Sequence, residues 1–155
     1  MILGIDGRLA NEPRPTGAGR YCREVIQALA SLKLDMKLRV YLDQAPREDL
    51  FTEDVELRFL PERMLWTHRA LARELRESPP DVFFTPVTQL PHKCPCPSLV
   101  SVLDLAVHSH PGHFPWQKRI PMRVKTDHAI RHGGHFIAIS ESTAAGLRSH
   151  YRLTP

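Results

Sequence analysis

Residues 2–21 read ILGIDGRLANEPRPTGAGRY, and this stretch predicts how the fold begins. Residues 2–6 form a short apolar run, which is typical of a strand buried in a parallel sheet. A loop rich in proline, glycine and arginine follows. A helix is then expected to open at Gly17, because apolar residues recur at helical spacing after it. The order strand, loop, helix is the first half of a β-α-β unit.

The same alternation continues along the chain. Further strands are predicted at residues 38–42, 55–60, 81–86, 98–103 and 135–139. Further helices are predicted at residues 65–76, 114–132 and 140–151. Strands that alternate with helices favour an α/β fold with right-handed crossovers. We therefore expect residues 1–155 to form one Rossmann-like, three-layer domain, with a mostly parallel sheet flanked by helices.

Composition narrows the class of protein. The chain has 155 residues, enough for one domain with a core of its own. Its longest apolar run falls short of the roughly 20 residues that cross a bilayer. Three cysteines without a secretory leader favour a reducing, cytoplasmic compartment. Two of them form a Cys94-Pro95-Cys96 turn, but there is no second pair to complete a zinc site, so no metal is expected.

The net charge of +4 is unevenly distributed. Most of the basic excess lies between residues 115 and 152, where the only acids are Asp127 and Glu141. The same region contains seven basic residues: Lys118, Arg119, Arg123, Lys125, Arg131, Arg148 and Arg152. Such a region forms a solvated helix face or meets an acidic partner, such as a phosphate-bearing substrate or an anionic membrane surface. No helix-turn-helix or RNA-binding signature is present, so nucleic acid is not an expected partner.

Ligands of doubly wound sheets bind beyond the carboxyl ends of the strands. Gly17 and Gly19 open a helix after the first strand, where free N–H groups and the helix dipole favour phosphate. Alternatively, the two glycines allow a tight turn or close packing. A third glycine at the spacing of a dinucleotide fingerprint is missing. Asp43, after the second strand, nevertheless keeps a nucleotide-cofactor interpretation open.

Other polar residues also follow predicted strands. Asp104 either binds substrate or caps a turn. Ser140 is expected first of all to cap the last helix, and it lacks the G-x-S-x-G frame of a catalytic serine. Three histidines lie in a segment expected to be irregular and fit no zinc spacing, so we interpret them as surface or cleft-lining residues: His108, His110 and His113.

Taken together, these segments resemble the N-terminal domain of the family-4 retaining glycosyltransferases, also called group 1. The resemblance rests on an ordered set of motifs across nearly the whole chain: residues 5–9, 16–21, 80–86, 100–105, 114–115 and 136–143. It implies one half of a GT-B fold, in which two Rossmann-like domains face each other across a cleft. The N-terminal half mainly holds the acceptor. The donor-binding C-terminal domain is expected beyond residue 155 and is absent from this chain.

The resemblance also implies an activity. A sugar of hexose type passes from a nucleotide-diphosphate donor to the hydroxyl of a sugar or lipid-linked acceptor, with retention at the anomeric carbon. The nucleotide sugar is a co-substrate, and no metal or other cofactor is implied. Gly17 and Gly19 match the loop near the donor phosphates. Arg20 and Ser140 are further candidates for phosphate contact, with Arg20 expected to stabilise the leaving diphosphate.

The sequence departs from the family pattern at one position. Asp104 matches the aspartate of a His-Asp-Leu motif and is the candidate catalytic residue, but Leu103 stands where the family has histidine. Leucine neither donates nor accepts a hydrogen bond. Three alternatives stay open, namely a different treatment of the sugar, weaker activity, or substitution by His108 or His110.

The isolated chain is expected to fold but to transfer no sugar, because the donor site is missing. The alternative function is a non-catalytic, Rossmann-like module that binds a phosphorylated ligand or rests peripherally on the anionic inner face of a membrane.

Overall fold

The computed structural model describes residues 1–32, 34–47, 51, 55–62 and 64–153. Within this part of the chain, six strands form one sheet in the order β3-β2-β1-β4-β5-β6. Every neighbouring pair is parallel, which confirms the α/β class and makes the sheet wholly parallel. The strands are β1 (Ile2–Asp6), β2 (Lys37–Leu42), β3 (Val55–Phe59), β4 (Val82–Thr85), β5 (Ser98–Val102) and β6 (His135–Ala138).

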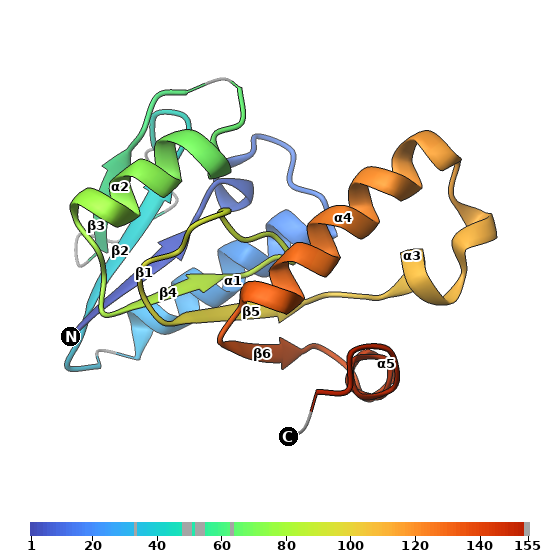
Figure 1. Cartoon of the computed structure of the whole chain (residues 1–155). Helices are drawn as coiled ribbons and strands as arrows, with labels where there is room; N and C mark the ends of the chain where they lie inside the picture. The colour runs from blue at the N-terminus through green and yellow to red at the C-terminus, as the bar shows by residue number, and fades with distance from the viewer. Residues whose placement is uncertain (33, 48–50, 52–54, 63, 154–155) are drawn as a thin grey trace.

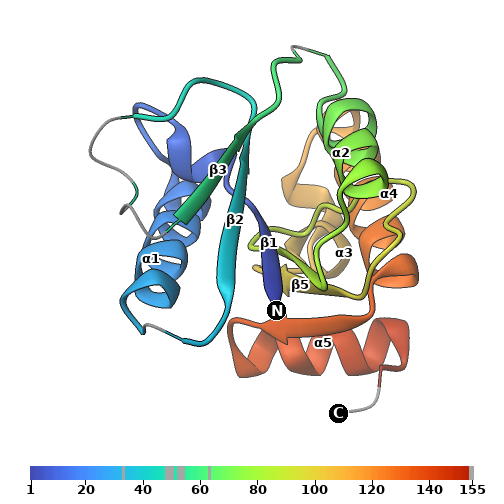
Figure 2. The same ribbon diagram turned by 90° about the vertical axis from the view of Figure 1, so that its left-hand side faces the viewer.

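Helices cover both faces of this sheet and produce three layers. Figure 2 shows α1 on one side, and α2 and α4 on the other. A further helix, α5, lies beside the edge strand β6 (Figure 1). None of the described helices is both long and apolar enough to cross a membrane. The bounds of these helices are α1 (Gly17–Ser31), α2 (Ala72–Glu77), α4 (Trp116–His132) and α5 (Glu141–Tyr151).

Short helical turns account for the differences from the sequence-based elements. The helix expected from residue 65 begins later, with the π-helical turn η2 (Thr67–Leu71). Its start is delayed because Leu65 is in the left-handed region, with a φ of 54°. The segment expected to be irregular instead holds α3 (Ala106–Ser109) and the 3₁₀ turn η3 (Pro111–His113). A further 3₁₀ turn, η1 (Leu9–Asn11), follows β1.

The connection from β4 to β5 contains no helix. Residues 86–97 instead form an irregular, bent segment between α2 and α4 (Figures 1 and 2). Pro91, Pro95 and Pro97 explain this conformation, because each removes a backbone N–H that a helix would use.

Apolar side chains from both faces of the sheet hold the layers together. Ile5 and Val40 are fully buried on the α1 side. Tyr41 and Phe83 are fully buried on the α2 side, with their ring centroids 6.3 Å apart. Burying one such side chain contributes about 1.5–3 kcal/mol. Burial on both faces explains why the central strands are continuous apolar runs instead of alternating ones.

Candidate functional site

The carboxyl ends of all the strands lie at one edge, because the sheet is wholly parallel. The direction of strand order reverses between β1 and β4. The chain after β1 therefore leads to the α1 face, whereas the chain after β4 leads to the α2 face (Figure 2). Such a switch point is where doubly wound sheets bind their ligands. The loop before α1 and Asp104, which follow β1 and β5, lie at this same edge.

Hydrogen bonds tie the start of α1 to the end of β5. The hydroxyls of Tyr21 and Ser101 lie 3.1 Å apart. Thr88, from the connection after β4, donates from its Oγ1 to the carbonyl oxygen of Ser101 at 3.1 Å. Ser101 is completely buried and lies three residues before Asp104. The first turn of α1 and the segment with Asp104 are therefore held together at the carboxyl edge.

The two glycines of α1 have different surroundings. A Cβ atom on Gly19 would lie 2.7 Å from the carbonyl oxygen of Leu9 and 2.9 Å from Cβ of Pro15. A Cβ atom on Gly17 would meet no atom of the described residues within 4 Å. Gly19 is thus required for close packing of η1 against α1, which is the alternative that the sequence left open. Gly17 leaves the amino end of α1 accessible, and Arg20 is exposed one turn further on.

Asp104 and Ser140 both hold the starts of helices. Asp104 is exposed, and its Oδ1 accepts a hydrogen bond from the N–H of Ala106 at 2.9 Å. This bond begins α3 and explains why the segment is not irregular. Ser140 Oγ accepts from the N–H of Thr143 at 3.1 Å, which confirms the predicted helix cap. Leu103 packs half-buried against the core on the α1 side.

His108, Asp127 and Tyr151 form a cluster that we call the helix corner, because they join α3, α4 and α5. The hydroxyl of Tyr151 donates to Asp127 Oδ1 at 2.6 Å, and His108 Nε2 lies 3.0 Å from the same oxygen. Partial burial favours a raised pKa of Asp127, but the hydrogen bonds from Tyr151 and His108 outweigh it and lower the pKa. The His108 side chain is only 8% exposed, so it does not line an open cleft.

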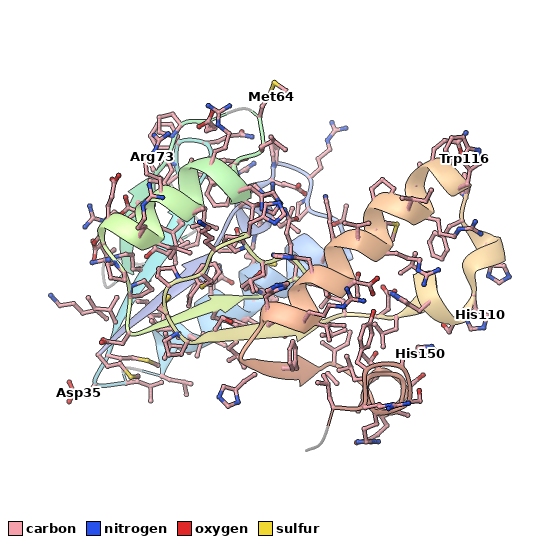
Figure 3. All side chains as sticks on the ribbon, in the orientation of Figure 1. Asp35, Met64, Arg73, His110, Trp116 and His150 are labelled. Carbon is pink, nitrogen blue, oxygen red and sulfur yellow. The ribbon has the colours of Figure 1, made fainter. Side chains whose placement is uncertain are left out.

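His110, in contrast, is exposed. Its Nδ1 lies 2.9 Å from the hydroxyl of Ser109, the residue before it. Figure 3 shows His110 far from the sheet, beyond the end of α4. Of the two histidines considered as substitutes for the family histidine, only His110 therefore has an accessible ring.

A second cluster lies at the switch point itself, and it was not singled out from the sequence. We call Arg8, Trp66, Thr67 and Gln89 the switch-point cluster. Arg8 Nη2 donates to Gln89 Oε1 at 3.3 Å, and Gln89 Nε2 donates to Thr67 Oγ1 at 2.9 Å. The guanidinium carbon of Arg8 lies 5.6 Å from the ring centroid of Trp66, within range of a cation–π contact. The cluster thus joins the chain after β1 to the chain after β4.

Behind this cluster lies a buried acid. Asp6 is 4% exposed and accepts a hydrogen bond from the backbone N–H of Arg8 at 3.1 Å. Burial raises the pKa of Asp6, and the positive charge of Arg8 opposes that rise. Asp6 therefore holds the backbone of Arg8 in place. The guanidinium group of Arg8 instead contacts Gln89, on the other side of the switch point.

The guanidinium of Arg8 retains unused hydrogen-bonding capacity. Its Nε is buried without a partner, and within the described residues its Nη2 bonds only to Gln89. Guanidinium is permanently charged and carries five N–H donors. The switch-point cluster can therefore bind an anionic or hydroxyl oxygen. The sequence signal was a basic residue two positions after the carboxyl end of a buried strand.

A pocket of about 660 Å³ lies beyond the ends of β2 and β3. Its lining contains two acids, Asp43 and Glu62, the amide of Gln44 and the ring of Phe59, which is 49% exposed. Burial raises the pKa of Asp43, and the charge of Arg8 opposes that rise. Carboxylates, an amide and an exposed ring beside the switch point form a surface suited to a hydroxyl-rich ligand.

Comparison with known protein families identifies the family of this chain. The family model described as Glycosyltransferase Family 4 matches residues 15–155. No curated protein matches the chain. The matched region covers nearly the whole chain, including α1, the connection after β4, Asp104 and the helix corner. The resemblance seen in the motifs is therefore confirmed, and the chain belongs to glycosyltransferase family 4.

Proposed function

We propose that this chain forms the acceptor-side wall of a glycosyltransferase that moves a hexose from a nucleotide-diphosphate donor to an acceptor hydroxyl, with retention. A second, donor-binding domain supplies the opposite wall. The observation that carries the proposal is the partly unpaired cation of Arg8 at the switch point, beside the accessible start of α1 at Gly17. Both lie at the edge where ligands of such sheets bind.

Positive groups at this edge have a defined task in the proposed reaction. Negative charge develops on the diphosphate as it leaves the sugar. The guanidinium of Arg8, the exposed Arg20 and the free N–H groups at the start of α1 stabilise that charge. The nucleotide sugar is a co-substrate in this proposal, and the reaction uses no further cofactor.

Asp104 remains the proposed contact to the reacting sugar. Its Oδ1 holds the start of α3, and its other oxygen has no hydrogen-bond partner within the described residues. That oxygen accepts a sugar hydroxyl in the proposed complex. His108 is not proposed for the task of the missing family histidine, because it is held within the helix corner.

We propose that the acceptor occupies the pocket beyond β2 and β3. Hydroxyl groups of a sugar can donate to Asp43 and Glu62, while one face of the sugar ring packs on Phe59. A hydroxyl held there lies next to the switch-point cluster, since the charge of Arg8 acts on the carboxyl group of Asp43. The pocket thus provides the acceptor side of the proposed reaction.

Gly17→Val tests the proposal in a polypeptide that contains this domain and a donor-binding domain. Valine fits the free space around Gly17 but hinders close approach of a diphosphate. Transfer from UDP- and GDP-hexoses is expected to fall about 100-fold in kcat/KM, the effect of losing one oxyanion contact, with the melting temperature unchanged. Full activity of folded Gly17→Val would contradict the role of α1. Transfer by the 155-residue chain alone would contradict the need for a second domain.

A membrane-associated variant of this function is supported by α4. Its first half projects beyond the carboxyl edge of the sheet (Figure 1), and Figure 3 places Trp116 at the far end. Trp116, Ile120 and Val124 share one helix face and are 63%, 54% and 61% exposed. Of the exposed bases of α4, Arg123 lies beside this apolar stripe, whereas Lys118 and Lys125 lie on the opposite side of the helix. Apolar contact combined with positive charge suits an anionic bilayer that carries a lipid-linked acceptor.

Vesicle co-sedimentation tests this second function. The chain is expected to sediment with phosphatidylglycerol vesicles but not with phosphatidylcholine vesicles, and high salt is expected to release it. Trp116→Ser combined with Ile120→Ser is expected to abolish sedimentation, whereas Met1→Ser, at another exposed apolar position, leaves it unchanged. Equal sedimentation of the double variant would contradict the role of α4.

A further inference from the structure

A pocket of about 670 Å³ lies on the α2 face, between α2, the β4–β5 connection and the end of α4. Arg76, Cys94 and His132 line it, and each lies a few residues before the start of a strand. The pocket therefore reaches along the α2 face from His68 and Leu90, next to the switch-point cluster, toward the amino edge of the sheet. We call it the histidine pocket, because His68 and His92 also line it.

Four imidazole rings form a column along this pocket. The rings of His68 and His92 are stacked, with centroids 4.0 Å apart. The ring of His128 lies 4.8 Å from that of His92, and the ring of His132 lies 4.4 Å from that of His128. These rings come from η2, the β4–β5 connection and α4, so only the fold brings them together.

Hydrogen bonds leave ring nitrogens of the column able to take up protons. His128 Nε2 donates to the carbonyl oxygen of Pro91 at 3.2 Å, and His132 Nδ1 donates to the carbonyl oxygen of His128 at 3.0 Å. A carbonyl only accepts, so each of these rings keeps its second nitrogen for another proton. His68 Nδ1 is buried and has no hydrogen-bond partner among the residues that the structure describes.

Permanent positive charges surround the column. Arg76 and Lys93 line the pocket, and Lys125 acts on His68 electrostatically. Cys94 is the remaining titratable residue in the lining, and no acid is present among the lining residues that the structure describes. Burial lowers the pKa of His68, and the charges of His92, His128 and Lys125 lower it further. Without a counter-ion in the lining, His68 therefore resists protonation.

This arrangement suits an anion better than a metal ion. No group of three or more His, Cys, Asp or Glu side chains converges as metal ligands would in the described part of the chain. A guanidinium, an ammonium and protonatable imidazoles are the groups that bind phosphate oxygens in proteins. A pocket of this volume, about 670 Å³, has room for a diphosphate.

We propose that the histidine pocket binds a phosphate-bearing anion of diphosphate size, and that binding draws protons onto the stacked imidazoles. Arg76 and Lys93 supply charge at any physiological pH, while His68, His92 and His132 add charge as they protonate. The negative charge of the anion offsets the repulsion between the protonated rings. An anion oxygen also accepts a hydrogen bond from the protonated Nδ1 of His68. This site does not depend on the proposed sugar transfer.

Linkage gives the direction of the pH effect. An anion stabilises the protonated form of each imidazole, so binding raises the pKa of the rings and takes up protons. Affinity must then increase as the pH falls through the pKa of the free rings. We expect inorganic pyrophosphate to bind about tenfold more tightly at pH 6 than at pH 8, the effect of raising one ring's pKa by about one unit.

Isothermal titration calorimetry with inorganic pyrophosphate tests the proposal on the chain as it stands. Titrations at pH 6 in two buffers of different ionisation enthalpy are expected to reveal proton uptake. Arg76→Gln and His92→Gln should each weaken binding about tenfold, whereas Arg73→Gln, on the same helix outside the pocket (Figure 3), leaves it unchanged. Arg76 and His92 are exposed, so both variants are expected to fold, which circular dichroism checks.

Two further arms identify the source of the anion. Competition by monomeric dihexanoyl phosphatidic acid would assign the pocket to a lipid headgroup, and its failure to compete would assign it to a soluble phosphate. Binding that Arg8→Gln abolishes and Arg76→Gln preserves would belong to the carboxyl edge and would overturn the proposal. No binding at pH 6, or binding without proton uptake, would also overturn it.

Discussion

The switch-point cluster and the helix corner are both polar clusters built from distant parts of the chain, yet they differ in what they leave unpaired. In the helix corner, Tyr151 and His108 both engage Asp127, so donors and acid satisfy one another. In the switch-point cluster, Arg8 has one side-chain hydrogen bond, at 3.3 Å, and one ring contact within the described residues. The first arrangement stabilises the fold, while the second holds a cation ready for a ligand.

The unpaired atoms of the two clusters have different chemistry. His108 Nδ1 and Arg8 Nε are both buried without a partner in the described part of the chain. In a neutral histidine that donates from Nε2, Nδ1 is only an acceptor lone pair. Arg8 Nε is a donor of a permanently charged group, and leaving such a buried donor without an acceptor is the more unfavourable of the two. A fold that retains such a group is consistent with a binding role for Arg8.

The largest effect on stability is expected at Gly19 of α1. Gly19 is closely surrounded by other atoms, whereas Gly17 in the same helix is not, so the pair offers the same kind of comparison as the two clusters. Gly19→Ala forces a methyl group against the backbone of Leu9 and should lower the free energy of unfolding by about 1–3 kcal/mol. Gly17→Ala meets no atoms and should change it by no more than about 0.5 kcal/mol. Urea unfolding followed by circular dichroism measures both. Equal stabilities would show that Gly19 is not closely packed.

A smaller loss is expected when the helix corner is opened. Tyr151→Phe removes the hydroxyl that Asp127 and His108 share and should lower the free energy of unfolding by about 1–2 kcal/mol. His110→Gln, at an exposed position nearby, serves as the control and should leave the melting temperature unchanged. A Tyr151→Phe variant as stable as the parent would mean that the corner does not hold the helices.

The pH dependence of stability gives a weaker but independent signal from the same corner. The pKa of Asp127 is lower in the folded chain than its ordinary value of 3.8. Its stabilising effect is therefore complete above that value and is lost as the pH falls through the folded pKa. Melting temperatures between pH 6 and pH 3 should fall less steeply in Asp127→Asn than in the parent chain. Identical pH profiles would contradict the lowered pKa.

The smallest effect concerns thiol reactivity and leaves the fold intact. Burial raises the pKa of Cys22 to about 12, so its thiol stays protonated. A hydrogen bond with Cys96, at an Sγ–Sγ distance of 3.8 Å, lowers the pKa of Cys94 despite partial burial. Iodoacetamide at pH 8 should therefore label Cys94 well before Cys22, as peptide mass spectrometry can measure. Faster labelling of Cys22 would indicate that the core opens near α1.

Local patterns predicted the elements but not the partners of their side chains. The apolar runs of β1 and β5 and the Ser140 cap could be seen in the sequence, because strand burial and capping depend on adjacent residues. Arg8 could not be assigned a role, since Gln89 lies 81 residues away and meets it only across the switch point. The short helix α3 has too few residues for a periodic signal, and its formation placed His108 inside the helix corner.

The most direct test of the central claim compares Arg8→Gln with Tyr151→Phe in a polypeptide that joins this domain to a donor-binding domain. Arg8→Gln is expected to lower kcat/KM for sugar transfer about 100-fold without changing the melting temperature, because it removes a cation from the switch point. Tyr151→Phe is expected to lower the melting temperature and, well below it, to keep its kcat/KM. Unchanged kcat/KM in folded Arg8→Gln would contradict the account.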